Sequence, residues 1–414
     1  MNVSEIVNRE SFAAWLEELP EERRYEWAVT LATRTALRVF PICFAKTEMG
    51  TAQERELTFL SSLRSLLISG VTGRMQTPDL KKAVAKAVDH DATGATAVAM
   101  YTAYAANPDA VYGYATSIAQ TANAAEVAFN VTYAAAERGP NPAAQRAAFA
   151  ASKMWRFLRH DIQMLDRADA LLHLPLWPEE TPIEIERAWN TGRSWMQTAP
   201  GHAFWIRWYD AILAGRPLTQ DWDSHWQLMH DIALIPDEAW GEGKEQDAIR
   251  VAGIIDLITQ KHALRQEVAG AKRALENETF NAMTLGRHRD NLPDDMPPSQ
   301  IVEYRARLRE LETALDEVDA ALVPPIPDVE VLEEATGRLW AIWEKIKKYP
   351  VALAFVTLIG AAATGAAGQA GVRGMDWFFD QGMPQLIRGS KDIAPKLSTP
   401  HEAPKGWEKP SVDI

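Results

Sequence analysis

The clearest hydrophobic pattern in the chain is a pair of heptad stretches between residues 246 and 323. In one, apolar residues recur with spacings of three and four: Ile301, Tyr304, Leu308, Leu311, Leu315, Val318 and Leu322. The other has the same spacing and includes one lysine: Ile254, Leu257, Lys261, Leu264, Val268, Ala271 and Leu275. A proline-rich loop separates the stretches, so we predict an antiparallel coiled-coil hairpin. Each arm could instead pair with a second copy of the chain, with Lys261 helping to select the partner.

Shorter helical patterns fill the N-terminal part. Within residues 1–75, apolar positions recur at helical spacing and predict a helical module: Phe12, Trp15, Leu16 and Leu19. Residues 76–152 are rich in Ala, the best helix former, and hold five of the nine tyrosines. They predict an Ala/Tyr-rich helical hairpin. A ligand groove lined by Tyr and Ala is the alternative.

Residues 153–245 hold nine of the fifteen tryptophans and predict a separate Trp-rich module of short helices. Trp carries a large buried area, so an aromatic core is the simpler interpretation. Because Trp, Tyr and Arg are enriched at binding hot spots, the alternative is a partner-binding surface. Its candidate residues are Trp205, Arg207, Trp208 and Tyr209.

An uncharged window follows a stiff linker and an amphipathic helix at residues 324–348. The 24 residues from Tyr349 to Val372 contain no charged side chain, and about 20 apolar residues suffice to cross a bilayer. We predict a transmembrane helix at 349–372. Its Ala- and Gly-rich second half makes insertion marginal, so the alternative is a buried helix in a soluble core. Small residues four apart predict a helix-association face: Gly360, Thr364 and Gly368.

The N-terminal sequence contains no basic region followed by an apolar run, so it predicts no signal peptide. We therefore expect a C-terminal anchor in the bacterial inner membrane, with the bulk of the chain cytoplasmic. Residues 373–414 are then a short, partly disordered tail beyond the crossing. A cytoplasmic protein without a membrane anchor is the alternative.

Composition narrows the possible functions. A net charge of −13 argues against non-specific nucleic-acid binding, which needs clustered Lys and Arg. The single cysteine, Cys43, excludes an internal disulfide framework and a Cys-based zinc site. It lies in an apolar run and is predicted to be a small buried hydrophobe.

The densest polar cluster lies along one predicted helix: Asp221, Asp223, His225, His230 and Asp231. His225 and His230 are five residues apart, so their side chains diverge and do not share a metal ion. Asp221 and His225 share a helix face, which allows a hydrogen-bonded pair. The chain has none of the common phosphate-binding, dinucleotide-binding, zinc-protease or nucleophile-elbow motifs. We predict no catalytic residue, cofactor or metal site.

Several segments resemble a set of bacterial Ala/Trp-rich helical proteins. These are WLEELPEERRYEWAVTLATRTALRVFPI, PLWP, FWIRWYDAILAGRPL, IPDEAWGEG and the helical hairpin after RHRDNLPDD. The resemblance covers about three quarters of the chain. It implies a helical architecture but brings no activity or site residue with it.

Together these patterns predict an all-α protein with several short-helix modules, an antiparallel coiled-coil hairpin and a C-terminal transmembrane helix. We expect a membrane-anchored interaction protein that binds a protein partner, or itself, through the coiled coil and the transmembrane helix. Its most concrete form is a membrane-acting effector in a bacterial defence or toxin pathway, a hypothesis from architecture alone. The alternatives are a soluble scaffold with residues 351–371 buried, and an enzyme with a site in the Trp-rich module.

Overall fold

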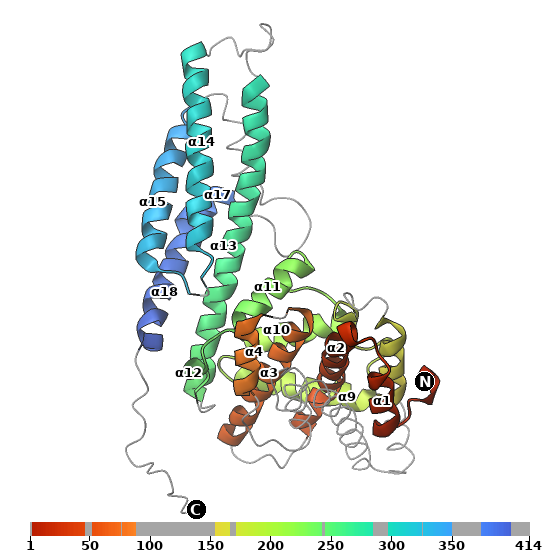
Figure 1. The fold of residues 1–414 in the computed structure, drawn as a ribbon. Coiled ribbons are helices and arrows are strands. Elements are labelled where there is room, and N and C mark those ends of the chain that lie inside the picture. Colours follow the sequence, from red (N-terminus) through yellow and green to blue (C-terminus); the bar gives the residue numbers. More distant parts are fainter. Residues whose placement is uncertain are drawn as a thin grey trace, which may run out of the picture. The chain divides into compact units, whose positions relative to one another are not determined.

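The computed structural model describes residues 2–45, 52–75, 77–87, 154–165, 171–241, 245–284, 297–324, 326–349 and 374–398. These residues form helices and no strand, which confirms the predicted all-α class (Figure 1). The chain divides into two compact units, Met1–Ile255 and Asp256–Ile414. The boundary falls within the long helix α13 (Glu245–Thr284).

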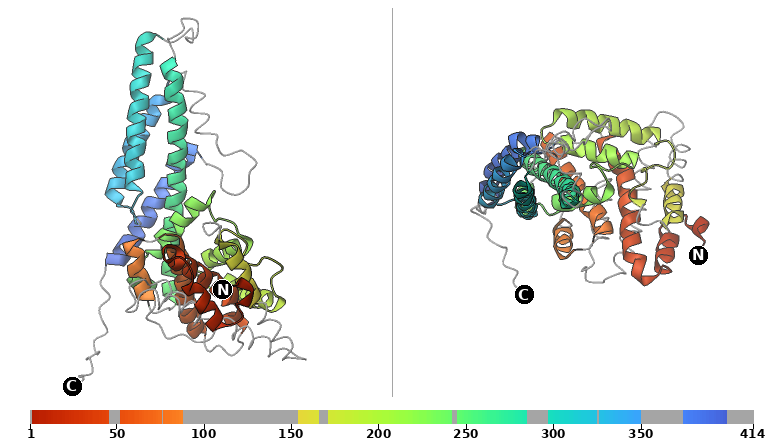
Figure 2. Two further views of the ribbon diagram at one scale, coloured as in Figure 1. Left: turned by 45° about the vertical axis from the view of Figure 1, so that its right-hand side comes forward. Right: turned by 90° about the horizontal axis from the view of Figure 1, so that it is seen from above.

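The first unit is built from short and medium helices, all visible in Figures 1 and 2. They are α1 (Arg9–Glu17), α2 (Glu21–Val39), α3 (Ala52–Arg74), α4 (Pro78–Ala87), α9 (Ile183–Thr198), α10 (Ala203–Ala214), α11 (Trp222–Ala233), α12 (Asp237–Trp240) and the start of α13. Two short 3-10 helices, η1 (Val3–Glu5) and η2 (Phe40–Ala45), flank the first two helices. Residues 154–163 are also helical.

Local sequence signals set the ends of these helices. Asn8 and Ser11 form a capping box at the start of α1, with the Asn8 side chain accepting from the Ser11 N–H at 2.9 Å. Asp221 caps α11 by accepting from the Ser224 N–H at 2.7 Å. Helix α10 ends at Gly215, whose φ of +59° is the left-handed conformation that glycine adopts at least cost.

Helix α2 lies at the centre of the first unit, and its residues from Trp27 to Val39 are buried all round. On one side Trp27, Ala28 and Leu31 share a core with α1 and with residues 154–165. On the other side α3 approaches closely, because Gly70 and Gly73 face the side chains of Thr33 and Thr30. The modules predicted at 1–75 and 153–245 therefore share one core. Most of the predicted hairpin at 76–152 lies outside the described residues.

The second unit is an antiparallel bundle. Its helices are α13, α14 (Pro298–Ala321), α15 (Val329–Ile346) and a continuous run made of α17 (Gly374–Trp377), the π-helix η5 (Phe378–Gly382) and α18 (Met383–Ser398). Arg265 pairs with Asp319 at 3.1 Å, whereas Glu278, further along α13, accepts from Tyr304 at 2.8 Å. Residue numbers thus rise on α13 as they fall on α14, so the two helices are antiparallel.

The other neighbours in the bundle alternate in the same way. Arg338 of α15 pairs with Glu317 of α14 at 3.2 Å. Lys391 of α18 pairs with Glu333 of α15 at 2.6 Å, and Phe379 meets Trp340 with 4.7 Å between ring centroids. The side-chain amide of Gln260 on α13 donates to Gln385 on α18 at 2.9 Å. The unit is therefore a four-helix bundle in which each helix runs opposite to its neighbours.

All the predicted heptad positions are buried, including Lys261. The α13 and α14 arms are antiparallel, as predicted, but they are not a free hairpin. Except for Ile254 and Lys261, their heptad residues share one core with Leu339 and Trp343 of α15 and with Phe378 and Leu386 of the fourth helix. Lys261 donates from Nζ to the Pro324 carbonyl at 3.0 Å, so it binds its own chain rather than selecting a second one.

Residues 373–414 were predicted to be a short tail, but residues 374–398 form the fourth helix of the bundle, which ends at Ser398. Two glycines bring this helix close to α13. A Cβ on Gly382 would lie 2.6 Å from Leu264, and one on Gly389 would lie 2.9 Å from Leu257. Residues 399–414 lie outside the described part of the chain.

In the parts of the chain that the structure describes, no helix has both the length and the apolar character needed to cross a membrane. Residues 350–373 lie outside those parts, and with them most of the predicted transmembrane helix and all of Gly360, Thr364 and Gly368. Its two flanks are described. Because α15 and α18 are antiparallel neighbours, the end of α15 and the start of α17 lie at the same end of the bundle.

Candidate functional site

The aromatic residues predicted as a partner surface lie mostly in the interior. Trp205, Trp208 and Tyr209 are buried, and only Arg207 is exposed. The Trp205 ring packs against Trp208 at 5.7 Å, and the Tyr209 hydroxyl donates to a backbone carbonyl of α2 at 2.7 Å. The first three therefore form part of the core, the simpler of the two interpretations. A partner-binding role stays a prediction for Arg207 alone.

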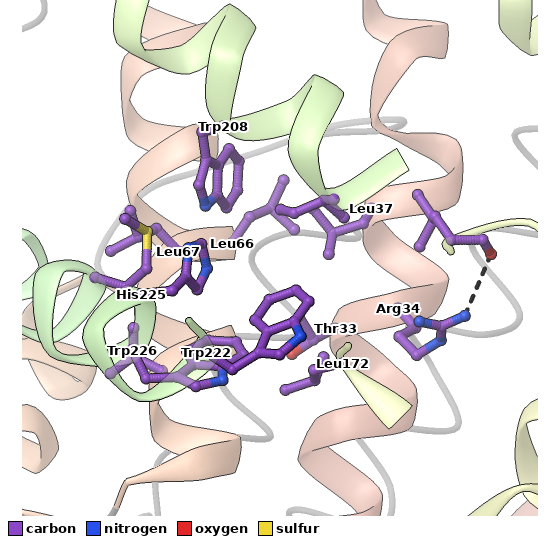
Figure 3. A pocket seen from close by; sticks show the side chains of 15 residues that line it. Thr33, Arg34, Leu37, Leu66, Leu67, Leu172, Trp208, Trp222, His225 and Trp226 are labelled. Atoms are coloured by element: carbon purple, nitrogen blue, oxygen red, sulfur yellow. Dashed lines mark hydrogen bonds between the residues drawn. The ribbon is translucent and has the colours of Figure 1, made fainter. Parts of the chain in front are cut away.

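A small cavity lies between α2, α3, α10 and α11 in the first unit (Figure 3). Most of its wall is apolar, with the rings of Trp208, Trp222 and Trp226 beside aliphatic side chains of α2 and α3. Its volume is about 30 Å³. A cavity needs roughly 10–15 Å³ in this measure to hold one water molecule, and an engineered apolar cavity that binds benzene has about 150 Å³. The cavity suits a very small molecule.

His225 brings one polar group to this cavity. Its side chain is buried, and its Nδ1 accepts a hydrogen bond from the Leu218 N–H at 3.1 Å. Burial lowers the pKa of His225 to about 4, with nearby His173 as a second cause. The ring is therefore neutral near pH 7, and because Nδ1 is an acceptor, its proton lies on Nε2. His225 thus offers one N–H donor at Nε2.

Thr33 brings the second polar group, from α2. It is 1% exposed and lines the cavity, and its Oγ1 has no hydrogen-bond partner among the described residues. Nearby hydroxyls on α2 and α3 donate to the carbonyl four residues earlier, as Thr35 does at 2.7 Å and Thr72 at 2.8 Å. A buried hydroxyl without a partner costs about 1–3 kcal/mol. Thr33 is the exception among these hydroxyls.

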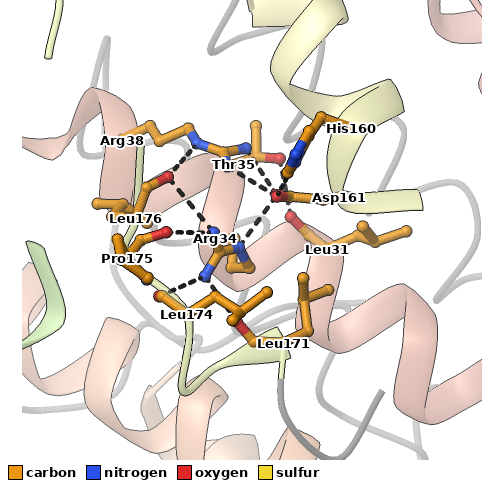
Figure 4. Close-up of polar contacts among 10 residues, drawn as sticks. All are labelled: Leu31, Arg34, Thr35, Arg38, His160, Asp161, Leu171, Leu174, Pro175 and Leu176. Atoms are coloured by element: carbon orange, nitrogen blue, oxygen red, sulfur yellow. Dashed lines mark hydrogen bonds and ion pairs between the residues drawn. The ribbon is translucent and has the colours of Figure 1, made fainter. Parts of the chain in front are cut away.

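Next to the cavity, α2 carries a buried ion network (Figure 4). Asp161 accepts from Arg34 Nε at 3.0 Å and from Arg38 Nη2 at 2.9 Å. The remaining four N–H groups of Arg34 each have a carbonyl acceptor, at 2.7 to 3.4 Å: Leu171, Leu174, Pro175 and Leu176. The network holds the 171–176 segment against α2, and that segment supplies part of the cavity wall.

The charge on Asp161 depends on the presence of both arginines. Burial by itself would raise the pKa of Asp161, but the guanidinium groups of Arg38 and Arg34 outweigh it and hold that pKa well below its usual range. Burial lowers the pKa of Arg34. The Arg38 guanidinium also lies over the rings of Phe157 and Trp177, at 5.6 and 5.7 Å. We interpret the network as structural.

The polar cluster along α11 does not assemble into a site. Asp221 and His225, expected to pair, each bind a backbone N–H instead. His230 Nε2 lies 3.4 Å from the Thr77 hydroxyl, and its Nδ1 lies 3.5 Å from Asp231. Over the described residues, no group of three or more His, Cys, Asp or Glu side chains is arranged to hold a metal ion. The side chain of Cys43 is outside the description.

Sequence analysis singled out His225 but missed Thr33 and the three residues of the ion network. One signal was present. Arg34 and Arg38 stand four apart in the run LATRTALRVF, which has no other charged residue, and this puts two charges on one face of a helix that is buried all round. No local signal marks Asp161 as their partner, more than 120 residues away.

The fold therefore defines an all-helical protein whose second unit is a four-helix bundle. Comparison with protein-family models, with curated proteins and with solved structures found no match for the chain.

Proposed function

We propose that this is a helical interaction protein that attaches to the cytoplasmic face of a bacterial inner membrane through residues 349–372, from one side. One observation carries the proposal. The antiparallel packing of α15 and α18 brings both ends of an uncharged 24-residue segment to the same end of one bundle. A segment that leaves and returns at one end of a bundle has to reverse its direction within its own length.

The available length supports shallow entry into the bilayer. Half of the 24 residues for each direction gives about 18 Å at the helical rise of 1.5 Å per residue. The hydrocarbon core is about 30 Å thick. Extended strands would reach further, but lipid leaves their backbone groups without hydrogen-bond partners. The segment thus has the length to enter about one leaflet.

The proposal changes the expected mode of association with partners. The heptad faces of α13 and α14 are covered by α15 and the fourth helix of the same chain. They are therefore not exposed for pairing with a second copy. Arg207, exposed on α10, is the candidate for contact with a protein partner. A membrane-acting effector is the most concrete form, because insertion into one leaflet unbalances a bilayer.

Flotation of the full chain with phospholipid vesicles tests the attachment. We expect the protein to float, and the double variant Phe355→Glu/Leu358→Glu to stay at the bottom of the gradient. Val331→Glu is the matched control, because it adds a charge at a 52% exposed position of α15 outside the segment. If the wild-type chain stays soluble beside vesicles and is monodisperse without detergent, the soluble scaffold is correct instead.

Reporter fusions in a bacterial host test the one-sided topology. We expect green fluorescent protein to fluoresce at either terminus, and alkaline phosphatase to be inactive at both. Active phosphatase at the C-terminus only would establish a single crossing and refute one-sided attachment. Release of a trapped dye from vesicles by the wild type, but not by Phe355→Glu/Leu358→Glu, would support the effector form.

A further inference from the structure

We propose that the last turn of α15 binds anionic phospholipid headgroups through the ammonium groups of Lys345 and Lys348. The inference rests on the proposed membrane attachment and names the lipid class that this attachment selects. Two exposed lysines carry it, because they lie on one face of the helix immediately before the uncharged segment begins.

The charge along this part of the sequence has one sign. Although the whole chain carries a net charge of −13, no acidic residue lies between Glu344 and Asp376. That interval contains four basic residues: Lys345, Lys347, Lys348 and Arg373. Basic residues that flank a membrane-associated segment are attracted to a leaflet surface that is rich in anionic lipids.

The bundle holds the last turn of α15 in place. Ile346, next to Lys345, is buried in the bundle core. Tyr349 packs against Tyr304 of α14 with 5.3 Å between ring centroids, and its N–H donates to the Ile346 carbonyl at 3.0 Å. Lys345 and Lys348 are three residues apart and both exposed, so their side chains leave the same face of the helix. An anionic surface can therefore meet both ammonium groups without further ordering of the backbone.

The neighbouring acidic groups do not neutralise these two lysines. The acid nearest in the sequence, Glu344, pairs with Lys347 at 3.0 Å, and Lys347 Nζ also lies 5.3 Å from the centre of the Trp340 ring. Neither Lys345 nor Lys348 forms an ion pair with a residue that the structure describes. A phosphate group complements them, because lysine binds phosphate as a point charge.

Lipid titrations of the full chain with two kinds of vesicle, read by flotation, test the lipid class. One vesicle is phosphatidylcholine alone, and the other is an equal mixture with phosphatidylglycerol, which is anionic. Because each lysine near such a surface strengthens binding about fivefold, Lys345→Gln/Lys348→Gln should weaken partitioning onto the mixed vesicles about 20–30-fold. Partitioning onto neutral vesicles should not change. Lys345→Arg/Lys348→Arg should bind as the wild type does, and so should the control Lys82→Gln/Arg187→Gln, which removes two exposed charges from the first unit.

A salt titration of the wild type gives a second test that needs no variant. Raising the salt from about 0.1 M to about 1 M shortens the Debye length from about 10 Å to about 3 Å and should reduce binding to the mixed vesicles to the level of neutral ones. A wild-type chain that binds both vesicles equally would refute the choice of anionic lipid, while the attachment stands. A chain that floats with neither would refute both. If Lys345→Gln/Lys348→Gln binds the mixed vesicles like the wild type but has a lower Tm, the lysines stabilise the helix C-terminus only, and the proposal is wrong.

Discussion

The two units specify the packing of their helices in different ways. In the second unit, one heptad rhythm selects the buried positions of α13 and α14, and charged pairs such as Arg265–Asp319 lie part-exposed at the margin. In the first unit, the central helix α2 buries two arginines against one aspartate from a distant segment. Apolar periodicity is enough for the bundle, whereas the first unit also needs a complete set of polar contacts.

This difference predicts where each unit is vulnerable. An apolar core loses stability in proportion to the contacts removed, so its cost is spread over many residues. A buried ion network fails abruptly, because removal of one partner leaves the other charges buried and unpaired. Single polar substitutions should therefore affect the first unit most.

Asp161→Ala should have the largest effect. It leaves Arg34 and Arg38 buried without their carboxylate, and breaking a buried pair in this way costs about 3–5 kcal/mol. Hydrogen exchange of the full chain should show amides of α2 losing protection, with those of α14 little changed. Arg156→Ala is the control, since its pair with Glu179 is exposed. Equal loss in both helices would refute a difference between the units.

Leu308→Ala should have the next largest effect, in the opposite unit. Leu308 is buried in the bundle core. Truncation of a buried leucine to alanine lowers the free energy of unfolding by about 2–5 kcal/mol, and we expect about 3–4 kcal/mol here. Amides of α14 and α15 should lose protection together. Val302→Ala on the same helix, where Val302 is 65% exposed, should change stability by less than about 0.5 kcal/mol.

The same contrast explains how much of the fold the sequence predicts. The heptad positions are all buried as predicted. A three-four spacing sustained over seven positions is a strong signal, because it places all seven on one face of the helix. The fourth helix was missed. Pro384, Gly389 and Pro395 resemble helix breakers, yet Gly389 is the residue that permits close contact with Leu257. Its role is visible only once α13 lies beside it.

The candidate site was less predictable for a related reason. The cavity and the ion network join α2 to segments more than 120 residues away, and no repeat or motif records such pairings. His225 stood out as a histidine in a polar cluster, but its expected partner Asp221 is a helix cap. Thr33 is distinguished only by a missing hydrogen bond, which requires the packed structure to recognise.

Acidification should weaken the first unit by about 3 kcal/mol. The pKa of His225 falls from its ordinary 6.5 to about 4 on burial, and each pKa unit is worth about 1.4 kcal/mol. Between pH 6.5 and 4 the His225 ring is protonated in the unfolded chain but neutral in the folded one. The stability present above pH 6.5 is therefore lost as the pH falls towards 4. Burial lowers the pKa of His202 as well, with the same sign.

Urea unfolding followed by hydrogen exchange at pH 7 and pH 4.5 measures this loss. We expect the amides of α11 to lose protection at the lower pH, and His225→Phe to reduce the difference between the two conditions. Asp161 does not contribute in this window, because its lowered pKa matters only as the pH falls below about 4. An unchanged pH dependence in His225→Phe would assign the effect elsewhere.

The smallest expected effect is also the sharpest comparison, because one substitution should act with opposite sign in the two units. Gly215→Ala forces a side chain into a left-handed conformation, and its Cβ would lie 2.4 Å from the backbone nitrogen of Pro175, in the segment that Arg34 holds. We expect a loss of about 1–2 kcal/mol. Gly337→Ala adds a methyl group inside α15 with nothing within 4 Å, and should stabilise the bundle by about 0.5–1 kcal/mol. Urea denaturation of both variants measures the two signs, and a gain from Gly215→Ala would mean that the 171–176 segment is free to move away.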